Sequence, residues 1–291
     1  MMVFGADKQI KRVDLDASKN LGMVNDVFED KSGTTWFLTD NGICRLNKTA
    51  RKPECFFSNM PGQSKSYSFN IATESRDDVW FGGNKGKFTR YNKKTTTFFD
   101  LNLGTQDDIS LVKAVEESGI LFITKENGFG FYNIKTGKVN FYNSKTLSGF
   151  PKENINFLGL TNSRYFWFGT KNSGVFQFDL VTEKLKQIKV DERENHVATS
   201  GKQKSFLLTS PNGTVWLQSN KGAFGYWDER QNKVVSVMKC IKESRETLSD
   251  VMYTAMFDRL GNLWFCSYKQ GLDLITFNNS NFLTLNLNSN D

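Results

Sequence analysis

One pattern of about 15 residues recurs six times along this 291-residue chain. Each copy has an aromatic-rich segment, a short polar loop that contains glycine, and a second segment in which apolar and polar residues alternate, as in "YFWFGTKNSGVFQFD" (165–179). The anchoring aromatic residues lie 42 to 49 positions apart. A repeat of this length constrains the fold strongly, because each copy must form one structural unit that packs on its neighbours. The anchors are Trp36, Trp80, Phe122, Trp167, Trp216 and Trp264.

The residues around each anchor repeat as well. An oxygen-bearing side chain lies six positions before the anchor, and glycine is common three positions before it, as in Asp30 and Gly33. This Asp-x-x-Gly spacing suits a tight turn, because the short oxygen side chain bonds nearby amides and glycine accepts positive φ. Arg164 occupies the glycine position in the fourth copy and is the exception.

Each copy reads as four short strands, A to D. In the first copy they are "MVNDVFED" (23–30), "TTWFLT" (34–39), "GICRLN" (42–47) and "KPECFF" (52–57). The chain has only 4 prolines and shows no long helical periodicity. Repeats of this length with four strands each are typical of β-propeller blades. We therefore predict an all-β fold in which the strand-B rings fill the space between four-stranded antiparallel blades.

The predicted boundaries place the whole chain, 1–291, in one propeller domain. A further segment, "KQIKRVDLD" (8–16), precedes the first copy and is similar to the D strand "KLKQIKVDE" (184–192). It is expected to be the orphan outer strand of an incomplete seventh blade, so that the chain is a fragment of a seven-bladed propeller. A six-bladed ring with a spare strand is the alternative. The six complete blades are predicted at about 21–58, 66–101, 109–144, 154–190, 204–239 and 250–287.

The segments "DRLGNLWFCSYKQGLDLI" (258–275) and "WFGTKNSGVFQFD" (167–179) resemble the two-component regulator propeller repeat, which reads roughly Asp-x-x-Gly-x-Leu-Trp-Ile-Gly-Thr, a loop, and Gly-Leu. The resemblance extends over nearly the whole chain. It implies the periplasmic sensor part of a hybrid histidine kinase, which recognises oligosaccharide fragments. In that family a second propeller, a small β-sandwich, a membrane helix, a kinase, a receiver and a DNA-binding domain accompany such a propeller.

The resemblance also implies the partners of this chain. They are an oligosaccharide ligand and the remainder of a sensor-kinase ectodomain, whose parent can form a homodimer. The loop lysines described below favour an anionic glycan as this ligand. The kinase is not expected within these residues, because the sole histidine, His196, lies in a predicted loop without a helical context.

No apolar run reaches membrane-spanning length, and we expect the signal segment to be absent from this chain. A net charge of +7 permits a polyanion but predicts no nucleic-acid partner.

No enzyme chemistry is predicted. Glycoside hydrolysis needs two carboxyl groups that face each other across a bond, whereas the recurring acidic residues, such as Asp30 and Asp258, occupy turn positions. The four cysteines lack C-x-x-C spacing and "FGGNKG" lacks the spacing of a phosphate loop, so no metal and no cofactor is expected. The alternatives to a sensor are a protein-interaction scaffold propeller and, less favoured, a glycan-cleaving propeller enzyme.

Candidate ligand-binding residues lie in the B–C loops. Lysine occurs in five of these six loops and would form a basic crown at one end of a closed ring, which attracts carboxylate or sulfate groups. Asparagine and tyrosine in the same loops could bond or stack on a sugar. The alternative interpretation is that the lysines are solvated and the asparagines serve the turns. The candidates are Asn84, Lys85, Lys125, Lys171, Asn172, Lys221, Tyr268 and Lys269.

Two further residue types leave alternatives open. Cys44 and Cys55 could lie opposite each other across a hairpin, which would permit a disulfide, but we favour unpaired small apolar residues within strands. Trp227 lies outside the strand-B register at the end of a strand C, and packing is favoured over exposure.

Overall fold

The computed structural model describes most of the chain, with gaps that fall in both halves. The described residues are 2–4, 10–12, 15, 21–49, 52–56, 67–115, 118–126, 128–161, 164–170, 173–188, 206–218, 224–236, 252–258, 260–267, 271–277 and 282–286.

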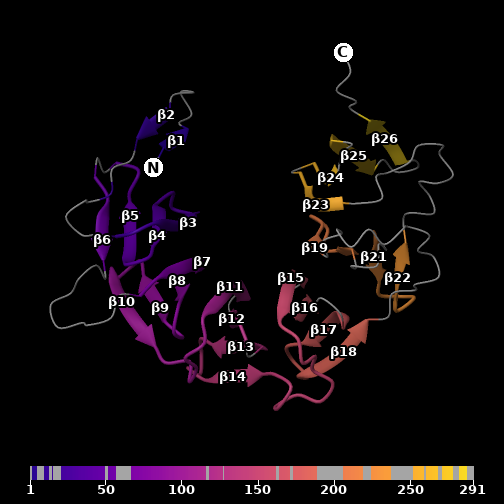
Figure 1. The fold of residues 1–291 in the computed structure, drawn as a ribbon, viewed down its shortest axis with the longest axis horizontal. Helices are drawn as coiled ribbons and strands as arrows, with labels where there is room; N and C mark the ends of the chain where they lie inside the picture. The colour runs from indigo at the N-terminus through magenta and orange to yellow at the C-terminus, as the bar shows by residue number, and fades with distance from the viewer. Residues whose placement is uncertain are drawn as a thin grey trace. The chain divides into compact units, whose positions relative to one another are not determined.

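Every regular element among these residues is a β-strand, which confirms the predicted all-β fold. The strands form six four-stranded antiparallel sheets and one two-stranded sheet. In each four-stranded sheet the order in space is the order in the chain, as Figure 1 shows. No helix long and apolar enough to cross a bilayer occurs within the described ranges.

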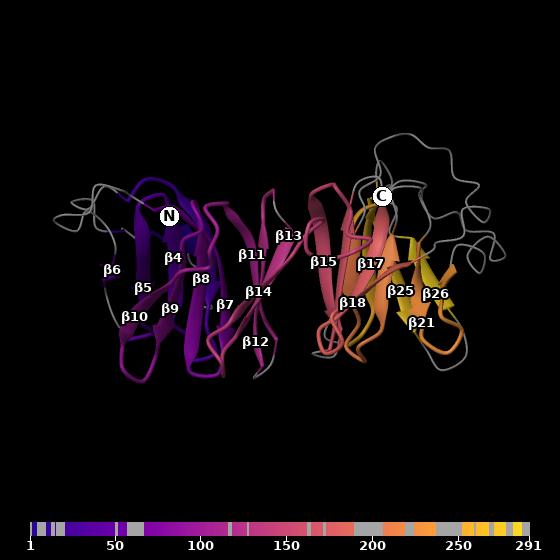
Figure 2. The ribbon, with the colours of Figure 1, turned by 90° about the horizontal axis from the view of Figure 1, so that it is seen from below.

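The chain divides into two compact units, 1–143 and 144–291, which are described separately. The N-terminal unit contains the hairpin β1–β2 and sheets 1 to 3, drawn in indigo to magenta in Figures 1 and 2. Its strands are β1 (Met2–Phe4) and β2 (Ile10–Arg12); β3 (Val24–Glu29), β4 (Thr35–Thr39), β5 (Gly42–Leu46) and β6 (Glu54–Phe56) in sheet 1; β7 (Phe69–Ser75), β8 (Asp78–Gly83), β9 (Phe88–Asn92) and β10 (Thr97–Leu101) in sheet 2; β11 (Ile109–Val115), β12 (Gly119–Thr124), β13 (Gly128–Asn133) and β14 (Val139–Tyr142) in sheet 3.

The C-terminal unit contains sheets 4 to 6. Its strands are β15 (Ile155–Thr161), β16 (Tyr165–Thr170), β17 (Gly174–Asp179) and β18 (Lys184–Ile188) in sheet 4; β19 (Phe206–Thr209), β20 (Val215–Gln218), β21 (Phe224–Asp228) and β22 (Lys233–Ser236) in sheet 5; β23 (Met252–Phe257), β24 (Leu263–Ser267), β25 (Gly271–Phe277) and β26 (Phe282–Asn286) in sheet 6.

The strand-B rings pack between sheets, as the sequence predicts. All six residues of β8 are buried, because neighbouring sheets cover both of its faces. The Trp36 ring of sheet 1 lies 5.2 Å from Phe81 and 4.9 Å from Tyr91, both in sheet 2. Trp227 is also buried, with its ring 5.3 Å from that of Trp167, which confirms packing over exposure.

The outermost strands differ from the central ones. Residues of β10 alternate between exposed and half-buried positions, and the space-filling view shows hydrophilic surface over the outer strands β10 and β14. Edge strands that carry polar and charged residues resist pairing with other chains. Burial therefore falls from strand B towards strand D, as expected when each sheet packs through its central strands.

The Asp-x-x-Gly turns close in the predicted way. The Gly33 amide donates to the Asp30 carbonyl at 2.8 Å, and Gly33 has φ +77°. The Asp30 carboxylate accepts bonds from the amides of Ser32 and Thr34 at 2.9 and 3.0 Å. The turn therefore depends on one short acidic side chain and on one residue at positive φ.

Arg164, the exception to this turn pattern, has an ionic role. Its guanidinium donates to Asp179 Oδ2 from Nε at 3.1 Å and from Nη2 at 2.7 Å, and it lies over the Tyr165 ring. The hydrogen bonds from Arg164 hold the pKa of Asp179 well below its usual range. The fourth repeat thus joins the turn before β16 to the end of β17 by an ion pair in which two guanidinium nitrogens share one carboxylate oxygen.

The segment 8–16 does not stand alone, because β2 pairs antiparallel with β1; three apolar residues are too short a run for periodicity to predict β1. That this segment is the outer strand of an incomplete seventh blade stays a prediction. One expectation is wrong. Cys44 and Cys55 are not unpaired: they lie directly opposite each other on β5 and β6 and form a disulfide. The spacing of the cysteines is compatible with both interpretations, and only the strand register decides between them. That the six sheets form one propeller domain over 1–291, and how many blades it has, stay predictions.

Candidate functional site

The predicted ligand-binding residues fall partly within the described chain. Asn84, Lys85 and Lys125 are described and lie in the N-terminal unit, after strands β8 and β12. The other five candidates, Lys171, Asn172, Lys221, Tyr268 and Lys269, lie outside the described residues.

Asn84 serves the turn. Its Oδ1 accepts a hydrogen bond from the Ser68 amide at 3.1 Å, and its own amide donates to the Ser68 carbonyl at 3.0 Å. Both contacts fasten the loop after β8 to the start of β7. The side-chain oxygen and the backbone amide of Asn84 are therefore occupied within the fold. A ligand could bond only its side-chain nitrogen.

Lys85 and Lys125 are exposed lysines held against the same acidic segment. The Lys85 amide donates to Asp108 Oδ1 at 3.0 Å, and the Lys125 amide donates to the Asp108 carbonyl at 2.9 Å. The next amide, of Glu126, donates to Asp107 Oδ2 at 2.8 Å. The segment between β10 and β11 thus joins the B–C loops of sheets 2 and 3. It places these two lysines beside Asp107, Asp108 and Glu126, and we call this group of residues the rim.

The charge of this rim is mixed. Two lysines share it with Asp107, Asp108 and Glu126, so the positive potential expected from the lysines alone is partly neutralised. Sequence reasoning missed the two aspartates because it considered only the basic residues of the loops between blades. Their signal was present in "TQDDIS" (105–110), where two acids stand directly before a strand A.

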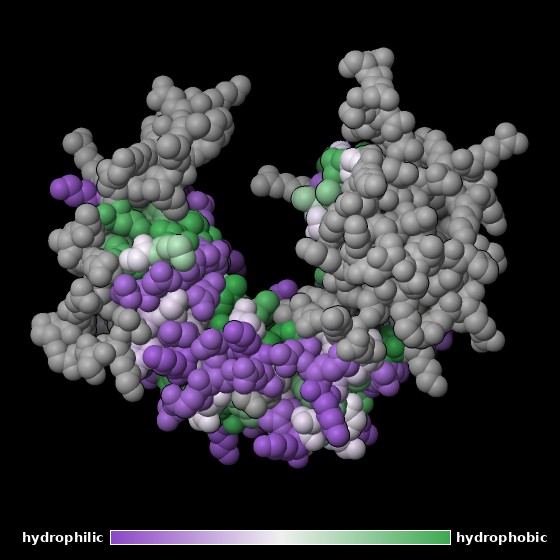
Figure 3. All heavy atoms as spheres, in the orientation of Figure 1, coloured by the Kyte–Doolittle hydropathy of each residue, from purple (hydrophilic) through white to green (hydrophobic). Residues whose placement is uncertain are grey.

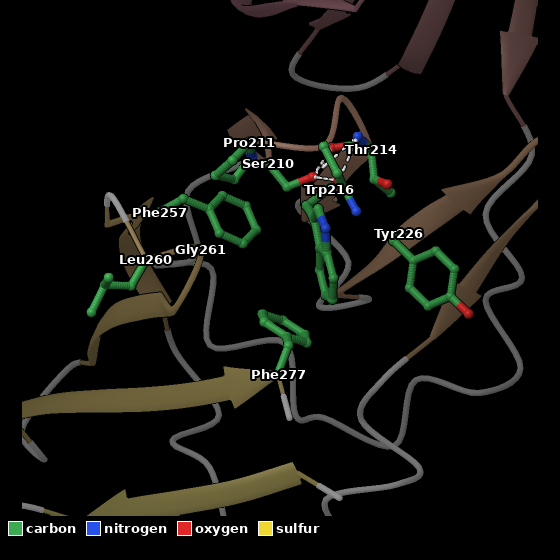
Figure 4. Close-up of a pocket in the computed structure, with 10 residues that line it drawn as sticks. Ser210, Pro211, Thr214, Trp216, Tyr226, Phe257, Leu260, Gly261 and Phe277 are labelled. Carbon is green, nitrogen blue, oxygen red and sulfur yellow. Dashed lines mark hydrogen bonds between the residues drawn. The ribbon is translucent and has the colours of Figure 1, made fainter. Parts of the chain in front are cut away.

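A second candidate site is a cavity of about 430 Å³ in the C-terminal unit, between sheets 5 and 6. Figure 4 shows Trp216 at its centre, with Tyr226 to one side and Phe257 and Phe277 to the other. The Trp216 ring lies 5.4 Å from Tyr226, 6.0 Å from Phe257 and 5.4 Å from Phe277. The turn that precedes β20 contributes polar side chains to its lip. An apolar wall with a few polar groups is the usual character of a small-molecule site.

This pocket lies at the strand ends opposite the B–C loops. Its residues come from the turn before β20 and from the ends of β23 and β25. The sequence analysis assigned the strand-B rings to packing and did not foresee a cavity beside one of them. Phe257 and Phe277 are 20 positions apart, and only the pairing of β23, β24 and β25 brings them together.

Comparisons with known proteins support the fold and relate the chain to a kinase. No protein-family model matches it. Histidine kinase P4 of Formosa agariphila is 26% identical over 180 residues, which cover 57% of this chain and 13% of that protein. The chain therefore spans a small part of the length of this curated relative.

Three solved structures have the same fold at low identity. The extracellular domain of a hybrid two-component system from B. thetaiotaomicron is 17% identical, with a TM-score of 0.59, over 92% of this chain and 35% of that one. The computationally designed protein Ika8 has a TM-score of 0.65 at 13% identity, over 96% and 78% of the two chains. YCF48 bound to D1 peptide has a TM-score of 0.58 at 11% identity, over 91% and 81%. At these identities each likeness supports the fold alone.

Proposed function

We propose that this chain is a ligand-binding sensor module of a hybrid two-component system and a member of the two-component regulator propeller repeat family. The observation that carries the proposal is the agreement between six repeats with that spacing, the propeller-type sheets they form, and the 26% identity to a histidine kinase. The kinase would lie elsewhere in a longer protein. The module would pass on the occupancy of its ligand site and would not turn the ligand over.

We place the module in the periplasm. The disulfide between Cys44 and Cys55 supports this location, because disulfides persist in oxidising compartments and are rare in the cytosol. In this proposal the rest of the sensor ectodomain, with a second propeller and a β-sandwich, adjoins the chain. Ligand-dependent contact with those neighbours, or between two copies of the parent, would carry the signal to the membrane.

The proposed ligand is an oligosaccharide fragment with acidic groups. Lys85 and Lys125 support it, because both are exposed and both extend from loops fixed by backbone hydrogen bonds. Fixed loops lower the entropy lost when a flexible ligand binds. The neighbouring Asp107 and Asp108 limit how many negative charges the ligand can carry at this place, since they repel a ligand with several closely spaced charges.

Calorimetric titration tests the proposal. Acidic and neutral oligosaccharides are titrated into the 291-residue chain and, in parallel, into the intact ectodomain of a protein that contains it. We expect saturable binding of an acidic fragment that weakens as salt rises, with the ligand unchanged after prolonged incubation. The proposal is wrong if the intact ectodomain binds no oligosaccharide, or if chromatography of the incubated ligand shows cleavage.

A further inference from the structure

We propose that the cavity between sheets 5 and 6 is a binding site for an uncharged sugar ring. This inference rests on the proposed function, since it assigns part of an oligosaccharide to a particular place. The cavity is lined by Trp216, Tyr226, Phe257 and Phe277, with Asn212 and Thr214 at its lip (Figure 4). None of the described residues that line it carries a charge. Its volume of about 430 Å³ is within the range of small-molecule sites.

At the corresponding place between sheets 1 and 2, polar contacts fill the space. There Glu74 accepts the Lys31 amide at 2.8 Å and forms an ion pair with Lys93. The Glu74 side chain is 6% exposed, so this ion pair fills the space beside the first turn. That junction serves as a reference for the junction between sheets 5 and 6.

Between sheets 5 and 6 the corresponding positions are aromatic. By strand pairing Phe257 and Glu74 are equivalent, because each pairs with the residue directly before a strand-B anchor. Counted along the chain from the anchor, Glu74 corresponds instead to Asp258, because the turn before β8 is shorter than the turn before β24. Phe277 and Lys93 are equivalent in the same way. Each lies two positions after the strand-C residue that pairs with the residue directly before the anchor. A polar bridge is thus replaced by two rings, and Phe277 is 40% exposed.

The hydrogen-bonding groups of the pocket also differ from those of the first sheet. In sheet 1 the anchor indole donates to Asp30, but in sheet 5 the equivalent residue is Ser210. The Ser210 hydroxyl is used within its own turn, where it accepts the Thr214 amide at 3.0 Å. Within the described chain no hydrogen bond is recorded for the Trp216 indole Nε1 or the Tyr226 hydroxyl. A donor and a hydroxyl therefore flank the apolar wall without partners of their own.

This combination matches the chemistry of a sugar ring. A pyranose presents C–H groups on its face and hydroxyls around its edge. The face would lie against the Trp216, Phe257 and Phe277 rings, and the edge would bond Trp216 Nε1, the Tyr226 hydroxyl and the side chains of the lip. A carboxylate or sulfate on the same ring is disfavoured, because the described lining of the pocket offers no cation to replace its water.

Saturation-transfer NMR on the whole chain tests the assignment. The probes are the methyl glycosides of glucose, galactose and mannose at millimolar concentration, with cyclohexanol as an apolar probe and an acidic oligosaccharide as a third. Phe277→Ala removes the exposed ring and Tyr226→Phe removes one hydroxyl. Phe99→Ala is the matched control, because Phe99 is 50% exposed in the N-terminal unit. The unfolding midpoint of each variant is measured as a check on folding.

We expect at least one methyl glycoside to bind, Phe277→Ala to weaken it about fivefold or more, and Phe99→Ala to leave it unchanged. Tyr226→Phe should weaken it with the midpoint preserved. Glycoside binding that is equal in all three variants overturns the pocket but leaves the sensor proposal standing. Binding of cyclohexanol without any glycoside also overturns it, since the cavity would then take apolar ligands. If only the acidic oligosaccharide binds, the sensor proposal is supported and the pocket assignment is wrong.

Discussion

The indole Nε1 of Trp36 donates a hydrogen bond to the Asp30 carboxylate at 3.1 Å, which joins a strand-B anchor to the turn that precedes it. Trp264 and Asp258 make the same bond at 3.0 Å in sheet 6. One carboxylate thus serves two purposes: it satisfies the turn amides with one oxygen and the buried indole with the other. In sheets 2 and 4 the position holds Glu74 and Thr161, and the indole nitrogens of Trp80 and Trp167 are buried without a partner among the described residues.

Replacement of Asp30 by alanine should destabilise the chain by about 1–3 kcal/mol, because it leaves a buried indole and several turn amides without an acceptor. Urea unfolding followed by fluorescence measures the change. The control is Glu29→Ala, which removes an exposed carboxylate one residue earlier. Equal midpoints for the two variants would show that the carboxylate is dispensable for folding.

The turns should also make stability depend on acid pH. Hydrogen bonds from Asn262 and Trp264 lower the pKa of Asp258 to about 2, below the ordinary aspartate value of about 3.9 in an unfolded chain. A depressed folded-state pKa contributes stability that is present above pH 4 and is lost as the pH falls towards 2. At Asp30 burial opposes the charged form, but hydrogen bonds from Ser32, Trp36 and Thr34 outweigh it and lower the pKa as well.

We therefore expect the urea midpoint to fall as the pH is lowered from 4 towards 2, and to fall less steeply in Asp258→Asn. Asparagine keeps an acceptor for the indole but cannot be protonated in this range. Measurements at constant ionic strength separate this effect from general charge repulsion. A variant whose midpoint follows the wild-type pH curve throughout would contradict the assignment.

The disulfide should stabilise the first sheet. Its closed loop spans 11 positions between Cys44 and Cys55, and closure of a loop of this size is worth about 2–3 kcal/mol. Cys44→Ser/Cys55→Ser should lower the urea midpoint accordingly, and the wild type in reductant should match it. Cys266→Ser is the control, since that thiol is exposed and free. Thiol titration of the denatured, unreduced chain should find two reactive cysteines; four would mean that the pair is reduced.

The lysines of the basic crown should be required for binding of an acidic ligand. Charge reversal at Lys125, Lys171 and Lys221 together should abolish binding of an acidic oligosaccharide and leave the unfolding midpoint unchanged, because exposed charges contribute only about 0–1 kcal/mol each. The control is Lys135→Glu, an exposed lysine in the turn between β13 and β14. Calorimetry measures binding, and unaltered affinity in the triple variant would show that the lysines are merely solvated.

Periodicity in the sequence was enough to predict the strands and their core. The anchors recur every 42 to 49 positions and each strand B is apolar on both sides, so burial between sheets follows from local pattern alone. The Asp-x-x-Gly turns were predictable for the same reason, since the hydrogen bonds that close them join residues within four positions. Strand β1 was missed because a strand of three residues has too few positions to establish a period, whereas β2 lies within the strand predicted at 8–16.

The candidate sites depend on contacts that no local pattern encodes. Lys85 and Lys125 were visible in the sequence, but that Asp107 and Asp108 hold both loops became known only from the fold. The cavity beside Trp216 required the register of three strands, which sets Phe257 and Phe277 where another junction has an ion pair. The sequence determined which side chains are apolar and how often they recur, because period depends on neighbours along the chain. Tertiary structure alone decided which of them meet, because a strand pairs with residues far away, and the shift of one position in register would turn each ring to the opposite face.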